Sequence, residues 1–290
     1  MRVLITGASG QVGTALMRSA PANIELRALS RAELNIADGA EVHAAIAGYQ
    51  PELIINAAAY TAVDNAETEP DLACAINAEG PRHLAQAAHS IPGCRMLHIS
   101  TDYVFDGHAS QPYGTSDETN PLSVYGCTKL LGENAVLAIL GKRAVVLRTA
   151  WVYAACGKNF LLTMLRLMRE RDTVRVVSDQ LGTPTSADSI ARALWAIAQR
   201  PQTTGIIHWT DAGTASWYEF AVAIATDGFA AGVLTKPVQV TPITTAEYPT
   251  VAHRPANSVL DCRESDVAVG LTRAPWRVNL RATLADMVPA

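Results

Sequence analysis

Short apolar runs alternate with amphipathic segments along the first half of the chain. The apolar runs are rich in Val, Ile and Leu, which predicts buried parallel strands, and the segments between them are typical of helices. The predicted strands cover residues 2–6, 24–29, 52–56, 95–100 and 143–148, and the predicted helices cover residues 14–20, 38–48, about 71–90 and about 123–140. This alternation predicts an α/β fold of the Rossmann type with a doubly wound parallel sheet.

The pattern changes after residue 150. Helices are predicted over residues 159–171, 186–199 and 217–226, strands over 173–177 and 206–209, and a polar loop rich in helix breakers over 178–185. No low-complexity linker separates the two halves. We therefore expect a nucleotide-binding domain over residues 1–150 and a smaller α/β substrate lobe over residues 151–290, interleaved with the first.

Composition narrows the class of protein. Apolar residues make up 49% of the 290 residues, as in globular proteins, and no apolar run is long enough to cross a bilayer. A net charge of -4 without a basic tract gives nucleic-acid binding no electrostatic support. The five cysteines contain no CxxC pair and read as free thiols in a reducing compartment. With no signal peptide visible, we expect a cytoplasmic protein without a membrane partner.

A glycine-rich turn follows the first predicted strand and precedes the first predicted helix, which is the context of a dinucleotide-binding site. The first glycine permits the tight turn, the second lets the backbone approach a pyrophosphate, and the third lets the helix pack on the strand. The free N–H groups at the helix start face the phosphates. The cofactor-binding residues predicted here are Gly7, Gly10, Gln11, Val12 and Gly13.

The second predicted strand ends at Ser30 and Arg31. NAD-selective sites carry an Asp or Glu here for the ribose 2′-hydroxyl, whereas a hydroxyl and a guanidinium suit a 2′-phosphate. NADPH is therefore favoured, with NADH as the other candidate; alternatively, Arg31 is only a solvated loop charge. Small residues after the third strand leave room for a cofactor, or for a tight strand–helix crossing. The stretch comprises Ala57, Ala58, Ala59, Tyr60 and Thr61.

Tyr125 and Lys129 lie four positions apart in a predicted helix and so share one face. An ammonium stabilises a phenolate, so we expect Lys129 to lower the pKa of Tyr125 from about 10 and make it a proton donor near pH 7. The alternative is an amphipathic helix with a buried Tyr and an exposed Lys. Thr101 follows the fourth strand, where its hydroxyl can bind a substrate carbonyl oxygen; otherwise it is a local cap. His98 is expected to be a core residue.

Taken in order, the motifs resemble the dTDP-4-dehydrorhamnose reductase family of extended short-chain reductases. The resemblance extends from residue 1 to about residue 285. It is carried by Gly7-x-x-Gly10-Gln11-x-Gly13 and by residues 56–59, 100–107, 124–129, 148–153, 179–185 and 254–260.

The resemblance implies NADPH-dependent reduction of the C4 ketone of dTDP-4-dehydrorhamnose to dTDP-L-rhamnose. Tyr125 would protonate the developing alkoxide, Thr101 would bind the oxygen and tune Tyr125, and Lys129 would hold the nicotinamide ribose. The remaining roles are implied as follows: Asn35 and Ile36 beside the adenine, Asp102 and Trp151 on the sugar, and Arg254 on the nucleotide phosphates or, alternatively, in a salt bridge.

Some positions depart from the family pattern. Asn35 stands where an Asp is common, and Ser30 lacks the carboxylate of some members, which loosens the case for NADH. Ala15 replaces a carboxylate that holds a bridging metal in some dimeric members. We therefore expect no metal, and a monomer or weak homodimer.

Four alternatives remain. A reductase of a related dTDP-4-keto-6-deoxysugar, of the talose or streptose type, would carry nearly the same motifs. A 4,6-dehydratase is disfavoured because Tyr103 stands where its Glu is needed, and a 4-epimerase is disfavoured only by the whole pattern. A non-catalytic NADP-binding regulatory subunit, like that of methionine adenosyltransferase, could also keep this fold.

Overall fold

Six parallel strands form the central sheet of the computed structural model, which describes residues 1–288. The strand order is β2–β1–β3–β4–β5–β10, so the direction of winding reverses beside β1. The bounds are β1 (Arg2–Thr6), β2 (Glu25–Leu29), β3 (Leu53–Asn56), β4 (Arg95–Thr101), β5 (Ala144–Thr149) and β10 (Gly205–His208). The predicted Rossmann-type, doubly wound sheet is confirmed. Ligands bind such sheets in the crevice where the winding reverses.

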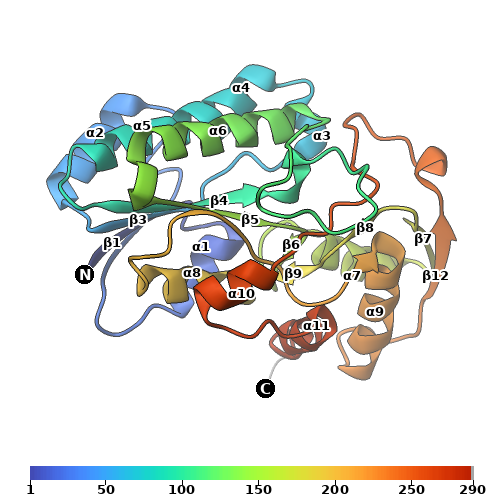
Figure 1. Cartoon of the computed structure of the whole chain (residues 1–290). Coiled ribbons are helices and arrows are strands. Elements are labelled where there is room, and N and C mark those ends of the chain that lie inside the picture. Colours follow the sequence, from blue (N-terminus) through green and yellow to red (C-terminus); the bar gives the residue numbers. More distant parts are fainter. Residues whose placement is uncertain (289–290) are drawn as a thin grey trace.

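Helices cover both faces of the sheet. One face carries α2 (Gly39–Tyr49), α5 (Gly80–His89) and α6 (Val124–Leu140), and the other carries α1 (Gln11–Arg18) and α8 (Ala187–Ala198) (Figure 1). A separate apolar cluster lies on each side of the strands. The inner strands β1, β3 and β5 are therefore buried on both faces, which explains their apolar sequences, whereas the edge strand β2 is partly exposed and carries Glu25 and Arg27.

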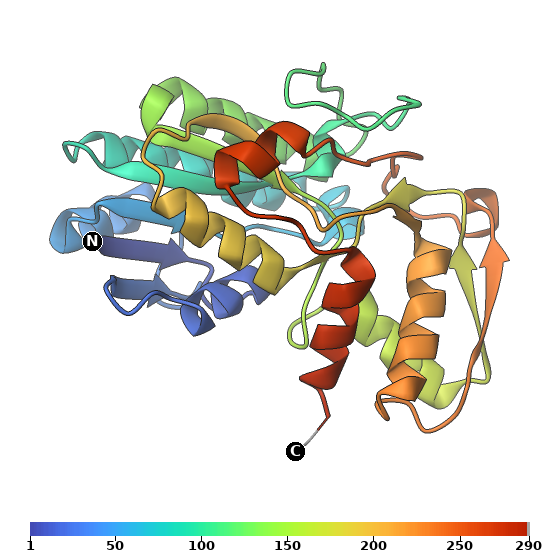
Figure 2. The same ribbon diagram turned by 60° about the horizontal axis from the view of Figure 1, so that its bottom comes forward.

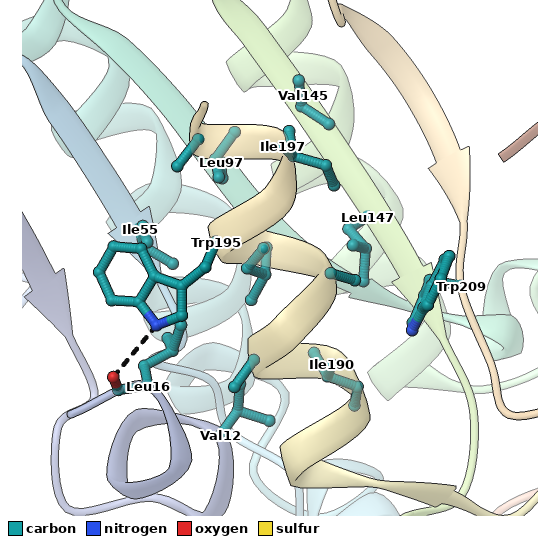
Figure 3. Packing of buried hydrophobic residues seen from close by; sticks show 14 of the residues in the cluster. Val12, Leu16, Ile55, Leu97, Val145, Leu147, Ile190, Trp195, Ile197 and Trp209 are labelled. Carbon is teal, nitrogen blue, oxygen red and sulfur yellow. Dashed lines mark hydrogen bonds between the residues drawn. The ribbon is translucent and has the colours of Figure 1, made fainter. Parts of the chain in front are cut away.

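Helix α8 joins the second half of the chain to the core of the first half. Figure 3 shows its apolar side chains packed on Ile55, Leu97 and Leu147 from three strands. The Trp195 indole N–H also donates to the backbone oxygen of Leu16, at 3.2 Å. Because β10 also pairs with β5, elements from beyond residue 150 complete the central sheet and its core.

A smaller α/β lobe lies beside the sheet (Figure 2). It contains α7 (Phe160–Glu170), α9 (Trp217–Ala230), α11 (Trp276–Ala285) and the parallel pair β7 (Thr173–Val177) and β12 (Gln239–Ile243) around an apolar cluster of its own. The short elements are α3 (Val63–Ala66), α4 (Pro70–Cys74), a π-helix (Ala75–Glu79), β6 (Val152–Tyr153), β8 (Leu181–Gly182), β9 (Thr185–Ser186), β11 (Ala215–Ser216), α10 (Arg263–Val269) and 3₁₀ turns over Asp102–Val104, Gly141–Arg143 and Thr245–Glu247.

Three sequence predictions differ from the structure in detail. The first helix begins at Gln11, because Gly10 already serves as its N-cap. The helix predicted over 71–90 is interrupted by the π-helix; Pro81 has no N–H for the carbonyl oxygen of Asn77, so the regular pattern cannot run through. The predicted loop over 178–185 contains the two-residue strands β8 and β9.

No helix within residues 1–288 has the length and apolar character needed to cross a membrane. Over the same range, no three His, Cys, Asp or Glu side chains are grouped so that they could hold a metal ion. All five cysteines are free thiols, as predicted.

Gly132→Ala is expected to lower the free energy of unfolding by about 1–3 kcal/mol, the usual cost of overpacking. A Cβ at Gly132 would lie 2.1 Å from the backbone oxygen of Asn77, so α6 and the π-helix would have to separate. Gly48→Ala is the matched control, because a Cβ there meets no atom within 4 Å and should raise stability by up to about 1 kcal/mol. Urea denaturation measures both. Equal stability of Gly132→Ala and wild type would show that the π-helix backbone can move away from α6 at no cost in free energy.

Candidate active site

A cavity of about 200 Å³ lies where β1, β2 and β3 end. It brings together predicted cofactor residues from three separate segments and adds three that the sequence did not single out. The predicted ones are Gly7, Gly10, Arg31, Asn35, Ile36, Ala57, Ala58, Ala59 and Tyr60, and the added ones are Ser9, Leu34 and Ile76. Ser9 and Leu34 adjoin predicted residues, whereas Ile76, in the π-helix, carried no sequence signal.

The backbone around the glycine turn is shaped for a dinucleotide. Gly7 has a φ of +73°, and a Cβ on it would lie 2.6 Å from the backbone nitrogen of Ala58. A Cβ on Gly13 would lie 2.2 Å from the backbone oxygen of Gly7. No side chain caps α1, and its first turn has no acidic residue. Its first N–H groups are therefore free to donate hydrogen bonds to a bound anion. The residues present therefore fit a nucleotide cofactor.

Seven predicted cofactor residues do not line this cavity. Three of them lie in helices, Gly13 in α1 and Tyr125 and Lys129 in α6. Gln11 accepts a hydrogen bond from the Asn159 side chain at 2.8 Å and so contacts the second half of the chain. Val12 is buried in the apolar cluster under α8. Thr61 is exposed, and the Ser30 side chain is bonded to Glu33.

The start of α6 is pressed against the turn that follows β4. Ser123 caps the helix by accepting from the Gly126 N–H at 3.2 Å. A Cβ on Gly126 would lie 2.2 Å from the backbone oxygen of Tyr103, so only glycine permits this approach. The approach places the Tyr125 phenol near the Thr101 hydroxyl.

Burial determines the protonation of the Tyr125–Lys129 pair. It raises the pKa of Tyr125 to about 12, against the lowering effect of the nearby Thr101 hydroxyl. It also lowers the pKa of Lys129 to about 8, while Glu133 acts in the opposite direction. The Lys129 ammonium donates to the backbone oxygen of Ile99 at 2.6 Å. The predicted lowering of the Tyr125 pKa by Lys129 is therefore wrong for this arrangement, because burial raises that pKa and the Lys129 ammonium is bonded to Ile99 instead.

Asp102 lies beside these groups with a side chain that is 2% exposed. Its Oδ1 accepts a hydrogen bond from the Thr101 hydroxyl at 3.0 Å, and its Oδ2 is buried without a partner. Burial raises the pKa of Asp102 to about 6, although the nearby Ser258 hydroxyl and the bond from Thr101 oppose this. An unpartnered buried carboxylate oxygen is costly, so Asp102 is suited to bind a hydroxyl group of a ligand.

Trp151 and Arg254, from the second half of the chain, are the other two predicted substrate residues, and Arg254 lies near Tyr103. Trp151 has a φ of +46°, rare for a bulky residue, and stacks on Trp217 with ring centroids 3.4 Å apart. Arg254 makes a bidentate ion pair with Asp64, with Nη2 at 2.7 Å from Oδ2. The salt-bridge alternative for Arg254 is therefore present in this structure.

Asn77 is a structural residue that sequence reasoning missed. Its side chain accepts from the Tyr60 N–H at 2.8 Å and donates to the Tyr60 backbone oxygen at 3.0 Å. It also donates to the Thr128 hydroxyl at 3.3 Å. Asn77 thus connects the cofactor cavity to the helix that carries Tyr125 and Lys129. His98 is fully buried, as predicted, and bonded to Asn56.

Comparison with known proteins gives one consistent answer. The family described as RmlD substrate binding domain matches residues 1–288. A dTDP-4-dehydrorhamnose reductase of Aggregatibacter actinomycetemcomitans is 43% identical, with 97% of each chain covered. The chain belongs to the dTDP-4-dehydrorhamnose reductase family.

Solved structures of this family have the same fold. The Clostridium acetobutylicum dTDP-4-dehydrorhamnose reductase matches with a TM-score of 0.92 and 41% identity, with 98% of each chain covered. The Bacillus anthracis dTDP-4-dehydrorhamnose reductase, in complex with NADP, has a TM-score of 0.91 and 33% identity over 98% of this chain and 99% of that one. Together with the glycine cradle, these matches support nucleotide cofactor binding by this member of the dTDP-4-dehydrorhamnose reductase family.

Proposed function

We propose that the chain catalyses NADPH-dependent reduction of the C4 ketone of dTDP-4-dehydrorhamnose to dTDP-L-rhamnose. The family match over residues 1–288 carries this proposal. The meeting of Thr101, Tyr125 and Lys129 beside the end of β4 supports it, because these are the groups that a carbonyl reduction requires.

The reduced nicotinamide, when bound, supplies the hydride that adds to the ketone carbon. Tyr125 is protonated at neutral pH, because its pKa is about 12, so its phenol can give a proton to the developing alkoxide. The Thr101 hydroxyl, which donates to Asp102 in this structure, would turn to donate a hydrogen bond to that oxygen and stabilise its charge. Lys129 would hold the nicotinamide ribose and stabilise the phenolate that Tyr125 becomes.

The sugar nucleotide is proposed to bind between the sheet and the lobe. In this proposal Asp102 and Trp151 contact the sugar, and Arg254 is shared between Asp64 and the nucleotide phosphates. A dehydratase would need a carboxylate at position 103, where burial instead raises the pKa of the Tyr103 phenol and keeps it neutral. A reductase of a related dTDP-4-keto-6-deoxysugar remains the alternative within the family.

We further propose that residues 1–150 bind the cofactor and residues 151–290 the sugar nucleotide. A cytoplasmic location, a monomeric or weakly dimeric state, and no nucleic-acid partner fit this role. The net charge of -4 supports the last of these proposals.

The test is a coupled assay with the purified chain. The 4-keto-L-sugar is made in place from dTDP-glucose by a dehydratase and an epimerase, NADPH oxidation is followed by absorbance, and the product is identified by NMR. Formation of dTDP-L-rhamnose supports the proposal. Formation of the other C4 epimer would keep the reductase but change its product, and cofactor binding without turnover would favour the non-catalytic alternative.

Arg31→Ala is expected to weaken NADPH binding by about tenfold and to leave NADH binding nearly unchanged. Arg31 lines the cavity, and its guanidinium would pair with the 2′-phosphate, which NADH lacks. Dissociation constants from the fluorescence of the bound reduced nicotinamide measure both. Equal weakening of the two cofactors would show that Arg31 does not contact the 2′-phosphate.

A further inference from the structure

The end of β2 lies directly against the glycine turn. The Ala8 N–H donates to the backbone oxygen of Leu29 at 3.1 Å, so Ser30, the next residue, begins beside that turn. Arg31 and Leu34, from the loop that follows, line the cavity. In a dinucleotide fold, the residue at this strand end faces the adenosine ribose and decides between a 2′-hydroxyl and a 2′-phosphate.

Both hydrogen-bond donors of Ser30 are already engaged. Oε2 of Glu33 accepts from the Ser30 N–H at 2.8 Å and from the Ser30 hydroxyl at 2.7 Å. These bonds, the backbone one first, lower the pKa of Glu33, so the carboxylate is ionised at neutral pH. The carboxylate that Ser30 lacks is therefore supplied by a residue three positions further along the loop.

The same contact occurs twice elsewhere within residues 1–288. Glu219 accepts from the N–H and hydroxyl of Ser216 at the start of α9, and Glu247 does the same with Thr244. There it caps a helix or a 3₁₀ turn. Glu33 differs from both in its position, because it holds a residue beside the glycine turn and lies two positions after Arg31.

We propose that Glu33 is a specificity-determining residue that favours NADH and opposes the preference for NADPH given by Arg31. The inference rests on the proposed function, since it requires a nicotinamide dinucleotide in this cavity. A 2′-phosphate would compete with the Glu33 carboxylate for the donors of Ser30 and would be repelled by its charge. A 2′-hydroxyl has no charge to be repelled and can donate a hydrogen bond to the carboxylate.

Glu33→Gln tests the proposal, because the amide oxygen can still accept from Ser30 while the charge is removed. We expect the dissociation constant of NADPH to fall by about tenfold and that of NADH to rise or stay the same. The change for NADPH should shrink at high salt, since it arises from charge at an exposed site. Glu247→Gln is the matched control, and it should change neither constant.

The outcomes separate this inference from the proposed function. Equal changes for NADPH and NADH in Glu33→Gln, or no change for either, would overturn the role of Glu33 and leave it as a turn-stabilising residue. If wild type bound neither NADPH nor NADH, the proposed function itself would fail. A tenfold shift confined to NADPH, sensitive to salt and absent in Glu247→Gln, would support the proposal.

Discussion

Tyr125→Phe is expected to lower kcat by at least about a hundredfold, while cofactor affinity stays close to that of wild type. The substitution removes only the phenolic hydroxyl, which is the proton donor of the proposed reaction. A hundredfold loss corresponds to about 2.7 kcal/mol of transition-state stabilisation. Because the hydroxyl lies beside Thr101 rather than within the apolar core, the fold should tolerate its removal.

Tyr103→Phe is the matched control for this variant. The two tyrosine rings lie 5.8 Å apart in an edge-to-face arrangement, and burial keeps the Tyr103 phenol neutral. The same atom is lost from the same neighbourhood, and kcat should fall much less than in Tyr125→Phe. Steady-state kinetics with the 4-keto sugar, together with NADPH binding, measures both variants. A Tyr125→Phe enzyme with near wild-type kcat would remove Tyr125 from the mechanism.

The parts of the structure that the sequence predicts are those that depend on neighbouring residues. The buried strands of the first half are apolar runs. Gly7 and Gly13 stand where a Cβ would collide with the neighbouring backbone, so the glycine spacing marks this turn in the sequence. Tyr125 and Lys129 are four positions apart, so the helical repeat alone predicts that their side chains share one face of the helix. These local patterns are why the sheet and the cofactor cavity could be predicted.

The features that the sequence does not predict depend on distant residues. Arg254 and Asp64 are 190 positions apart, and nothing in the sequence near either residue identifies the other as its ion-pair partner. Likewise, the strand over 205–208 is local, but its place beside β5 follows from packing. The pKa of Tyr125 depends on how deeply the phenol is buried, which helix spacing does not reveal. Glu33 was missed because its hydrogen bonds to Ser30 depend on the conformation of the turn, which the sequence does not show.

Arg148→Met is expected to lower the free energy of unfolding by about 3–5 kcal/mol, the usual cost of leaving one partner of a buried ion pair alone. The side chains of Arg148 and Glu133 are 3% and 1% exposed. The guanidinium donates through Nε at 3.0 Å and through Nη2 at 2.7 Å, and it also lies over the Phe105 ring. Lys129 cannot take over this role, because its ammonium is directed to the Ile99 backbone oxygen.

A double variant separates two contributions to the stability lost in Arg148→Met: the lost attraction between Arg148 and Glu133, and the cost of leaving the Glu133 charge buried alone. Glu133→Met combined with Arg148→Met removes both charges, so it should recover much of the stability that Arg148→Met loses. Arg166→Met is the matched surface control, since the Arg166–Glu170 pair is exposed and should be worth less than about 1 kcal/mol. Urea denaturation measures all three. If Arg148→Met were no more destabilising than Arg166→Met, water or Lys129 would have to solvate or pair with Glu133 in the variant. The position of α6, the helix that carries Tyr125 and Lys129, would then not depend on the Arg148–Glu133 pair.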